Sequence, residues 1–490
     1  MARAEVPDGE KIPYVIAYHE IIEAPKPNAT YDPMRCDVIY DGDISPDFYG
    51  WVFPHGGSAS VGMGTGLDGF VGLNGPYRLD TDHDGDLTDE SINSSAVGLE
   101  LQDIDVGLAI YLDRTSTDGY LAVSASTSTA SDVGVPVFDV TVNDLNVNLN
   151  LSTSGSSVLD LAGDAALTVP IDATSATTTL DFNGQRGTLV QAAGDIDVRV
   201  DELMTVSGSV AFERSTRELT LANGSTTRAD MLSFGGDGLD AQLGAGSVGL
   251  TVSDLAFGAA VFSSQSPDLG DARWASLTAT AGGVTPSAVG SASVGASDLS
   301  VEVNMVHGLP SGVAGDRMVI DYSPDATGAI DILTGPNSST SIDFDGSLGQ
   351  LLKASGSMSV KVGDFLELSG SLGFERSLQT VLVDGQSVTT EMVSVGGTDL
   401  EGFVGIGPYR LDLDSDGRVD QDEINPDARG FAISGVSFGM GTFSDQNSDR
   451  QWTAARAEAG TVGGMLGIPE DVSLDIFDLG VGLNLAAADG

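Results

Sequence analysis

The residues best suited to chemistry are the acidic side chains that gather in two short loops. In the segment 412–423, acids stand at positions 1, 3, 5, 9 and 12, with glycine at position 6. The glycine permits a sharp turn that brings the first carboxylates together, and position 7 offers its backbone carbonyl. A set of hard oxygen ligands without Cys or His favours Ca²⁺ over transition metals. The predicted ligands are Asp412, Asp414, Asp416, Arg418 (through its carbonyl oxygen), Asp420 and Glu423.

A second loop, from 80 to 91, repeats the first half of this pattern. Its predicted ligands are Asp80, Asp82, Asp84, Asp86 and Glu90. Position 12 is Ser91, so the bidentate clamp is lost unless Glu90 replaces it, and we expect weaker binding. Both loops resemble the EF-hand calcium loop, but their flanks do not predict paired long helices. This favours a structural Ca²⁺ site with a Kd of about 10⁻⁴ to 10⁻³ M. The alternative is an acidic turn that binds no ion.

The loops belong to a segment that repeats along the chain. Residues 206–215 match residues 368–377, and residues 120–150 match residues 274–304. The acidic insert that follows Gly407 is absent from the middle copy. We therefore predict four parts: a fragment at 1–65, the tail of a first repeat with a calcium loop at 66–152, a second repeat without the loop at 153–310, and a third repeat with the loop at 311–490.

Apolar residues alternate with polar ones throughout the repeats. Leu145, Val147 and Leu149 are separated by Asn, and the segments 206–212 and 366–374 show the same alternation. A period of two predicts strands with one buried face. The dipeptides Asn223-Gly224 and Asp384-Gly385 predict hairpins. The expected fold is all-β, made of tandem repeats of antiparallel strands. Stacked sheets in a sandwich and a broad solenoid-like sheet remain open alternatives.

The composition excludes several classes of function. The 490 residues include 71 acidic and 21 basic side chains, for a formal net charge of −50. Nucleic-acid partners are not expected, because binding phosphates requires a basic surface. No apolar run is long enough for a membrane helix, and the single cysteine precludes an intrachain disulfide. The four histidines are too scattered to indicate a zinc or catalytic cluster.

Residues 1–65 differ from the rest and carry a motif of their own. Their signature has the form P-x-x-Y-x-W-x-F-P followed by G-x-G, and resembles flavin-dependent geranylgeranyl reductases, most closely the bacteriochlorophyll-synthesis branch. The matching residues are Pro46, Tyr49, Trp51, Phe53, Pro54, Gly62 and Gly64. The resemblance implies a small α+β fragment whose aromatic strip lies over a prenyl-substrate pocket beside FAD.

The rest of a flavin site is not visible in the sequence. No G-x-G-x-x-G element precedes residue 31, so nothing places a pyrophosphate at a helix N-terminus. We therefore expect no enzymatic activity, with an FAD-dependent geranylgeranyl diphosphate or bacteriochlorophyll reductase as the alternative. The seam at residue 66 falls inside a repeat unit, and we interpret the chain as a chimera, with a mis-assembled or mispredicted gene as the hypothesis for its origin.

Residues 66–490 have a resemblance of a different kind. The motifs V-x-G-S-V-A-F-E, G-F-V-G-x-x-G-P-Y and D-x-D-x-D-G are similar to those of giant repetitive, calcium-binding, adhesin-like or LEPR-XLL-type bacterial proteins. This implies an extracellular or cell-surface location and a structural or adhesive role, although no signal peptide is visible. The implied partners are calcium, other repeats or a component of the cell surface or matrix.

Overall fold

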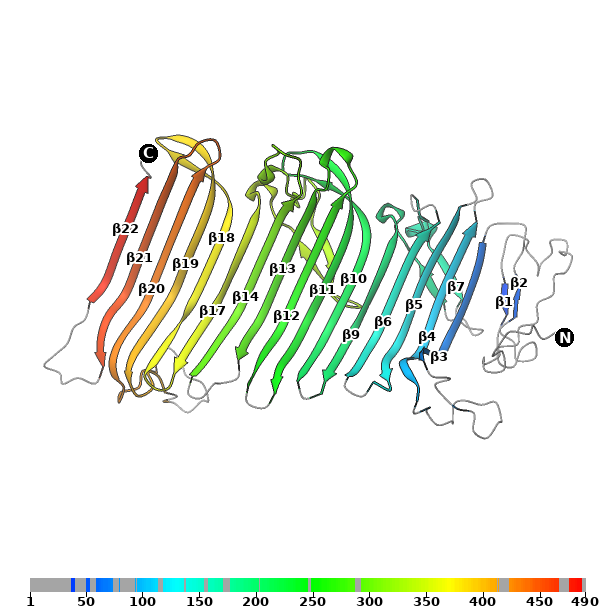
Figure 1. Ribbon diagram of the computed structural model, residues 1–490, viewed down its shortest axis with the longest axis horizontal. Helices are drawn as coiled ribbons and strands as arrows, with labels where there is room; N and C mark the ends of the chain where they lie inside the picture. Colours follow the sequence, from blue (N-terminus) through cyan, green and yellow to red (C-terminus); the bar gives the residue numbers. More distant parts are fainter. Residues whose placement is uncertain are drawn as a thin grey trace. The chain divides into compact units, whose positions relative to one another are not determined.

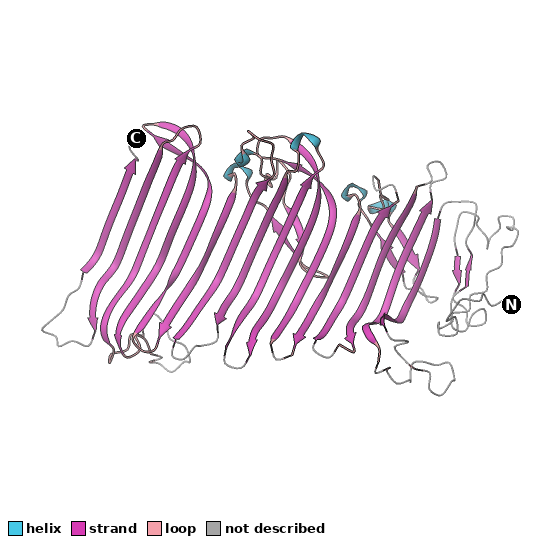
Figure 2. Ribbon diagram, viewed as in Figure 1, coloured by secondary structure: helices cyan, strands magenta, loops and turns pink. Residues whose placement is uncertain are grey.

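The described part of the chain is almost entirely β-structure, with short 3-10 turns and no α-helix among the described residues (Figure 2). The computed structural model describes residues 37–39, 50–52, 59–73, 79, 93, 95–112, 118–135, 138–153, 157–170, 177–201, 203–245, 248–286, 292–411, 413, 423–466 and 476–486. The chain divides into two compact units, Met1–Gly194 and Asp195–Gly490. No helix in the described ranges could cross a membrane.

The first unit is built on an antiparallel meander. Its strands follow one another in the order β3 (Ala59–Leu73), β4 (Val97–Leu112), β5 (Gly119–Val133) and β6 (Phe138–Ser152). A short hairpin, β7 (Leu167–Pro170) and β8 (Thr177–Leu180), packs on β4 and β5. The strands β1 (Asp37–Ile39) and β2 (Gly50–Val52) pair with each other in a separate sheet. The rest of the predicted α+β fragment lies largely outside the described residues.

The second unit is a longer antiparallel meander, which is interrupted once by an insert that leaves the sheet (Figure 1). Strand β9 (Leu189–Val200) contains the division between the units. The strands that follow in this sheet are β10 (Met204–Thr220), β11 (Thr226–Ala245), β12 (Val248–Ser264), β13 (Arg273–Pro286), β14 (Ala292–His307), β17 (Leu351–Val362), β18 (Leu366–Val383), β19 (Gln386–Ile406), β20 (Arg429–Asp445), β21 (Gln451–Leu466) and β22 (Ile476–Ala486). Between β14 and β17 the hairpin β15 (Ile330–Leu333) and β16 (Ser339–Ile342) leaves the sheet.

Two inserts each cover one face of the strands beneath them, and we name them flap 1 (residues 157–170 and 177–188) and flap 2 (residues 308–350). Flap 2 places β15 and β16 against β10 to β13. On β11 the side chain of Met231 is 1% exposed beneath it, whereas Phe234, which points to the opposite face, is 47% exposed. The main core of the second unit therefore lies between flap 2 and the sheet; its largest fully buried members are Trp274, Tyr322, Phe262, Leu219, Leu221 and Met231.

The all-β prediction is confirmed, as are both hairpins. Asp384 and Gly385 join β18 to β19 with φ of 50° and 77°, the left-handed values of a tight two-residue turn. The long strands form one large antiparallel sheet with a small flap in each unit, so the structure is nearer to the broad sheet than to a sandwich of stacked sheets. The predicted buried face is wrong for β10, because Ala211 and Glu213 are buried by the flap while Phe212 points the other way.

Candidate functional site

The base of the second acidic loop rests on a small apolar core at the end of β19. The rings of Phe403 and Tyr409 stack with centroids 5.1 Å apart and an interplanar angle of 12°. Both side chains are buried, and Ala428 and Ala432 complete the cluster. The Arg410 guanidinium lies 5.2 Å from the centroid of the Tyr409 ring. Burial is the main cause of the raised pKa of Tyr409. This core fixes where the loop leaves the sheet.

Backbone hydrogen bonds hold the two ends of the loop together. The N–H of Leu411 donates to the carbonyl of Glu423 at 3.2 Å, and the N–H of Asn425 donates to the carbonyl of Tyr409 at 3.0 Å. The Asn425 side chain donates through Nδ2 to the carbonyl of Pro408 at 2.7 Å. Asn425 is only 4% exposed, so these bonds are shielded from water. The loop therefore starts and ends at one fixed point.

Glu423 is the one predicted calcium ligand among the described residues. Its side chain is 9% exposed, and its Oε1 accepts a hydrogen bond from the N–H of Leu413 at 2.7 Å. The carboxylate is therefore held at the loop base. The other predicted ligands lie outside the described residues: Asp412, Asp414, Asp416, Arg418, Asp420, Asp80, Asp82, Asp84, Asp86 and Glu90. Within the described ranges, no three or more Asp, Glu, His or Cys side chains form a group suited to a metal.

The two acidic loops rejoin the sheet through the same turn. At Asn425 the side-chain Oδ1 accepts from the N–H of Asp427 at 2.9 Å, and the carbonyl accepts from the N–H of Ala428 at 3.1 Å. At Asn93 the corresponding distances are 3.0 and 2.9 Å. An asparagine that bonds the backbone two residues on is a common way to fix a turn. The sequence pattern does not reveal this role, although an Ile-Asn pair follows both loops.

The reductase motif is divided between described and undescribed residues. Trp51 lies on β2 opposite Val38. Gly62 and Gly64 lie on β3, opposite Leu108 and Val106 of β4. Strand β3 continues through the predicted boundary at residues 65 and 66, where its pairing with β4 shifts register. Four motif residues lie outside the described ranges: Pro46, Tyr49, Phe53 and Pro54.

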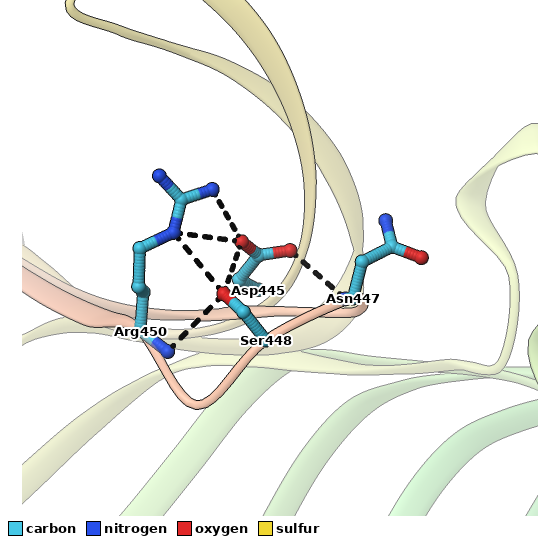
Figure 3. Close-up of polar contacts among 4 residues, drawn as sticks. All are labelled: Asp445, Asn447, Ser448 and Arg450. Carbon is cyan, nitrogen blue, oxygen red and sulfur yellow. Dashed lines mark hydrogen bonds and ion pairs between the residues drawn. The ribbon is translucent and has the colours of Figure 1, made fainter.

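A polar turn that no sequence motif predicts joins β20 to β21 (Figure 3). Asp445 Oδ2 accepts hydrogen bonds from the Ser448 hydroxyl at 2.6 Å and from Arg450 Nη2 at 2.6 Å. Its Oδ1 accepts from the N–H of Asn447 at 2.9 Å. These bonds, with Ser448 contributing most, lower the pKa of Asp445 to about 2. Arg450 also lies over the ring of Trp452, 5.3 Å from its centroid.

The turn should give the chain a measurable acid sensitivity. A carboxylate whose pKa is lowered by folding stabilises the folded state above its ordinary pKa, and this contribution disappears as the pH falls through the folded pKa of about 2. We expect Asp445→Asn to be less stable than the parent at pH 5 and to approach it at pH 2. Urea unfolding followed by circular dichroism at both pH values measures the difference. Two curves separated equally at both pH values would contradict this assignment.

Comparisons with known proteins match only part of the chain. No family model matches it. A 104-residue stretch, 21% of the chain, is 55% identical to geranylgeranyl diphosphate reductase of Rhodobacter capsulatus and covers 26% of that protein. Stretches of 52 residues are 42% and 44% identical to the chloroplastic geranylgeranyl diphosphate reductases of Oryza sativa subsp. japonica and Arabidopsis thaliana, covering 11% of each. A stretch of the chain is thus similar to part of geranylgeranyl diphosphate reductases, and the chain spans 26% or less of these relatives' length.

Proposed function

We propose that this chain is an extracellular structural or adhesive β-repeat protein that Ca²⁺ stabilises at its acidic loops, and that it is not an enzyme. The observation that carries the proposal is the closure of the second loop. Both loop ends are pinned to one buried core, and the Glu423 carboxylate is held beneath them. Closing a loop in advance lowers the entropy lost when its carboxylates converge on an ion.

The residues of the second loop fit this ion in their chemistry. Bound Ca²⁺ would be held by the carboxylates of Asp412, Asp414, Asp416, Asp420 and Glu423 and by the carbonyl of Arg418. It would supply positive charge to a group of like charges that otherwise repel one another. In a chain with a net charge of −50, such neutralisation stabilises the folded state. The partners we propose, other repeats or a surface component, follow from this structural role.

Limited proteolysis tests the proposal at the loop itself. Arg418 stands in the middle of the ligand pattern, so trypsin should cut after it readily in EGTA and slowly in millimolar Ca²⁺. Mass spectrometry of the fragments identifies the cut. In Glu423→Gln, which loses one charged ligand, calcium should protect the bond much less. Equal cleavage of the parent chain with and without Ca²⁺ would contradict the proposal.

A second candidate function rests on the reductase fragment. The 104-residue stretch that is 55% identical to a geranylgeranyl diphosphate reductase favours an FAD-dependent activity on prenyl substrates. The chain covers 26% of that relative, which is why we rank this candidate second. Absorption of the purified chain between 350 and 500 nm, after loading with FAD and gel filtration, separates the two. A stable flavin spectrum would favour the reductase.

A further inference from the structure

One set of side chains recurs on three groups of strands, and we name each set a platform. The second platform has Phe262 on β12 opposite Trp274 on β13, with Asn304 on β14. The other two sets hold the same positions in the same strand register: the first is Tyr111, Tyr120 and Asn150, and the third is Phe443, Trp452 and Asn484. The repeat therefore preserves a surface as well as a strand order.

Flaps cover the first two platforms, and one asparagine contact is common to both. On the second platform, Trp274 Nε1 donates to the carbonyl of Met318 at 2.6 Å, and Asn304 Nδ2 donates to the carbonyl of Ile320 at 2.8 Å. Trp274 and Asn304 are both 0% exposed. On the first platform, Asn150 Nδ2 donates to the carbonyl of Leu159 of flap 1 at 2.7 Å. The platform asparagine therefore anchors a flap backbone in both copies.

The flaps themselves close in a common way. In flap 2 the N–H of Tyr322 donates to the carbonyl of Phe344 at 3.0 Å, and Asp321 accepts from the N–H of Gly346 at 3.1 Å. In flap 1 the matching bonds, from Leu161 to the Phe182 carbonyl and from Gly184 to Asp160, measure 2.8 and 3.0 Å. One type of two-stranded segment thus fits one type of platform.

No segment that the structure describes covers the third platform. Trp452 is partly exposed and Asn484 is exposed, whereas their counterparts Trp274 and Asn304 are fully buried. A groove of about 410 Å³ lies at this place. The residues that line it include Val381, Val383, Phe443, Trp452, Asn484 and Ala486. The aromatic and amide groups that hold a flap elsewhere here face solvent.

A glycine beside each platform gives independent evidence that the third platform has room for a flap. A Cβ on Gly107 would lie 2.3 Å from Thr178 Cγ2 of flap 1, and a Cβ on Gly258 would lie 2.4 Å from Thr340 Cγ2 of flap 2. Both positions must stay bare for a flap to lie on the sheet. The matching residue of the third platform is Gly439, where a Cβ would have no atom within 4 Å. The space that a flap requires is kept, although no described segment fills it.

We propose that the third platform binds a flap-type segment of a partner chain, with the chemistry of residues 308–350. Such a segment offers two backbone carbonyls, one to the indole N–H of Trp452 and one to the amide of Asn484. Its apolar strand residues, the equivalents of Ile332 and Ile342, would cover Phe443 and Trp452. The segment would lie as a hairpin on the face of the sheet, as flap 2 does, so the fit of side chains would decide specificity.

The test attaches this segment to the full chain. Residues 308–350 are fused after Gly490, downstream of β22 as flap 2 is downstream of β14, so that the segment is present at a high effective concentration. We expect acrylamide quenching of Trp452 to fall several-fold and hydrogen exchange in β22 to slow. The fluorescence difference should vanish in Trp452→Phe. Unchanged quenching and exchange on fusion would overturn the proposal.

Two matched variants locate the bound segment. Gly439→Val should leave the unfused chain as stable as the parent, because the site is open, yet should restore full quenching in the fused chain. Leu485 follows Asn484 in β22 and points to the opposite face of the sheet. Leu485→Ala should therefore change neither the stability of the unfused chain nor the quenching of Trp452 in the fused chain. Protection that survives Gly439→Val would place the segment elsewhere and refute the proposal.

If the fusion misfolds, the peptide 308–350 is added in trans at about 1 mM, a level that reveals even weak affinity. Unchanged Trp452 quenching there would be equally contradictory.

Discussion

Removal of calcium with EGTA should lower the melting temperature of the chain by about 3 to 10 °C relative to 10 mM Ca²⁺. At this concentration Ca²⁺ stands at about 10 to 100 times the expected Kd, which stabilises the folded state by about 1.4 to 2.7 kcal/mol. For a domain of 150 to 250 residues each kcal/mol shifts the melting temperature by roughly 2 to 4 °C. Differential scanning calorimetry in the two buffers measures the shift, and magnesium at the same ionic strength controls for screening of the net charge.

Two variants separate bound calcium from general charge neutralisation. Asp416→Ala combined with Glu423→Gln should remove most of the shift, and the glutamine keeps an oxygen that can accept from the N–H of Leu413. Asp427→Ala removes one negative charge just outside the ligand pattern and should leave the shift intact. A double variant that still gains the full shift, or an Asp427→Ala chain that loses it, would contradict the assignment of the ligands.

Trp274→Ala should be the most destabilising single substitution in the second unit, costing about 3 to 5 kcal/mol. The indole is 0% exposed under flap 2, and its N–H donates to the carbonyl of Met318. Truncation leaves a large cavity and a buried carbonyl without its donor. The matched control is Trp452→Ala, the same position of the third platform, which is partly exposed and should cost about 1 kcal/mol. Urea unfolding followed by circular dichroism measures both, and similar losses would show that flap 2 is not what buries Trp274.

The strands and tight hairpins were predictable because their signals are local. Period-two alternation reports a strand whatever packs on it, and Asp384-Gly385 encodes its own left-handed turn. The choice of covered face was not predictable. On β11, Met231 faces the flap while Leu232 and Phe234, equally apolar, are 38% and 47% exposed on the other side. The flaps were not predictable either, because strands of four residues are too short to show the alternation of apolar and polar residues.

The bulges and polar turns were missed for a different reason. Asp103 and Asp254 adopt φ of 51° where the strand register shifts, a conformation that aspartate accepts more readily than most residues. In a chain with 71 acidic residues, a structural aspartate does not stand out from a solvated one. Asn425 and Asp445 were missed in the same way, since their roles depend on backbone N–H groups that the sequence pattern does not mark.

Isothermal titration of the metal-free chain with CaCl₂ is the most direct test of the central claim that an oxygen-rich loop binds a divalent ion and stiffens the sheet. Saturable heat with a Kd of about 10⁻⁴ to 10⁻³ M, reduced by the Asp416→Ala and Glu423→Gln pair, is the predicted result. A titration that reaches about 10 mM with only heats of dilution would contradict the claim.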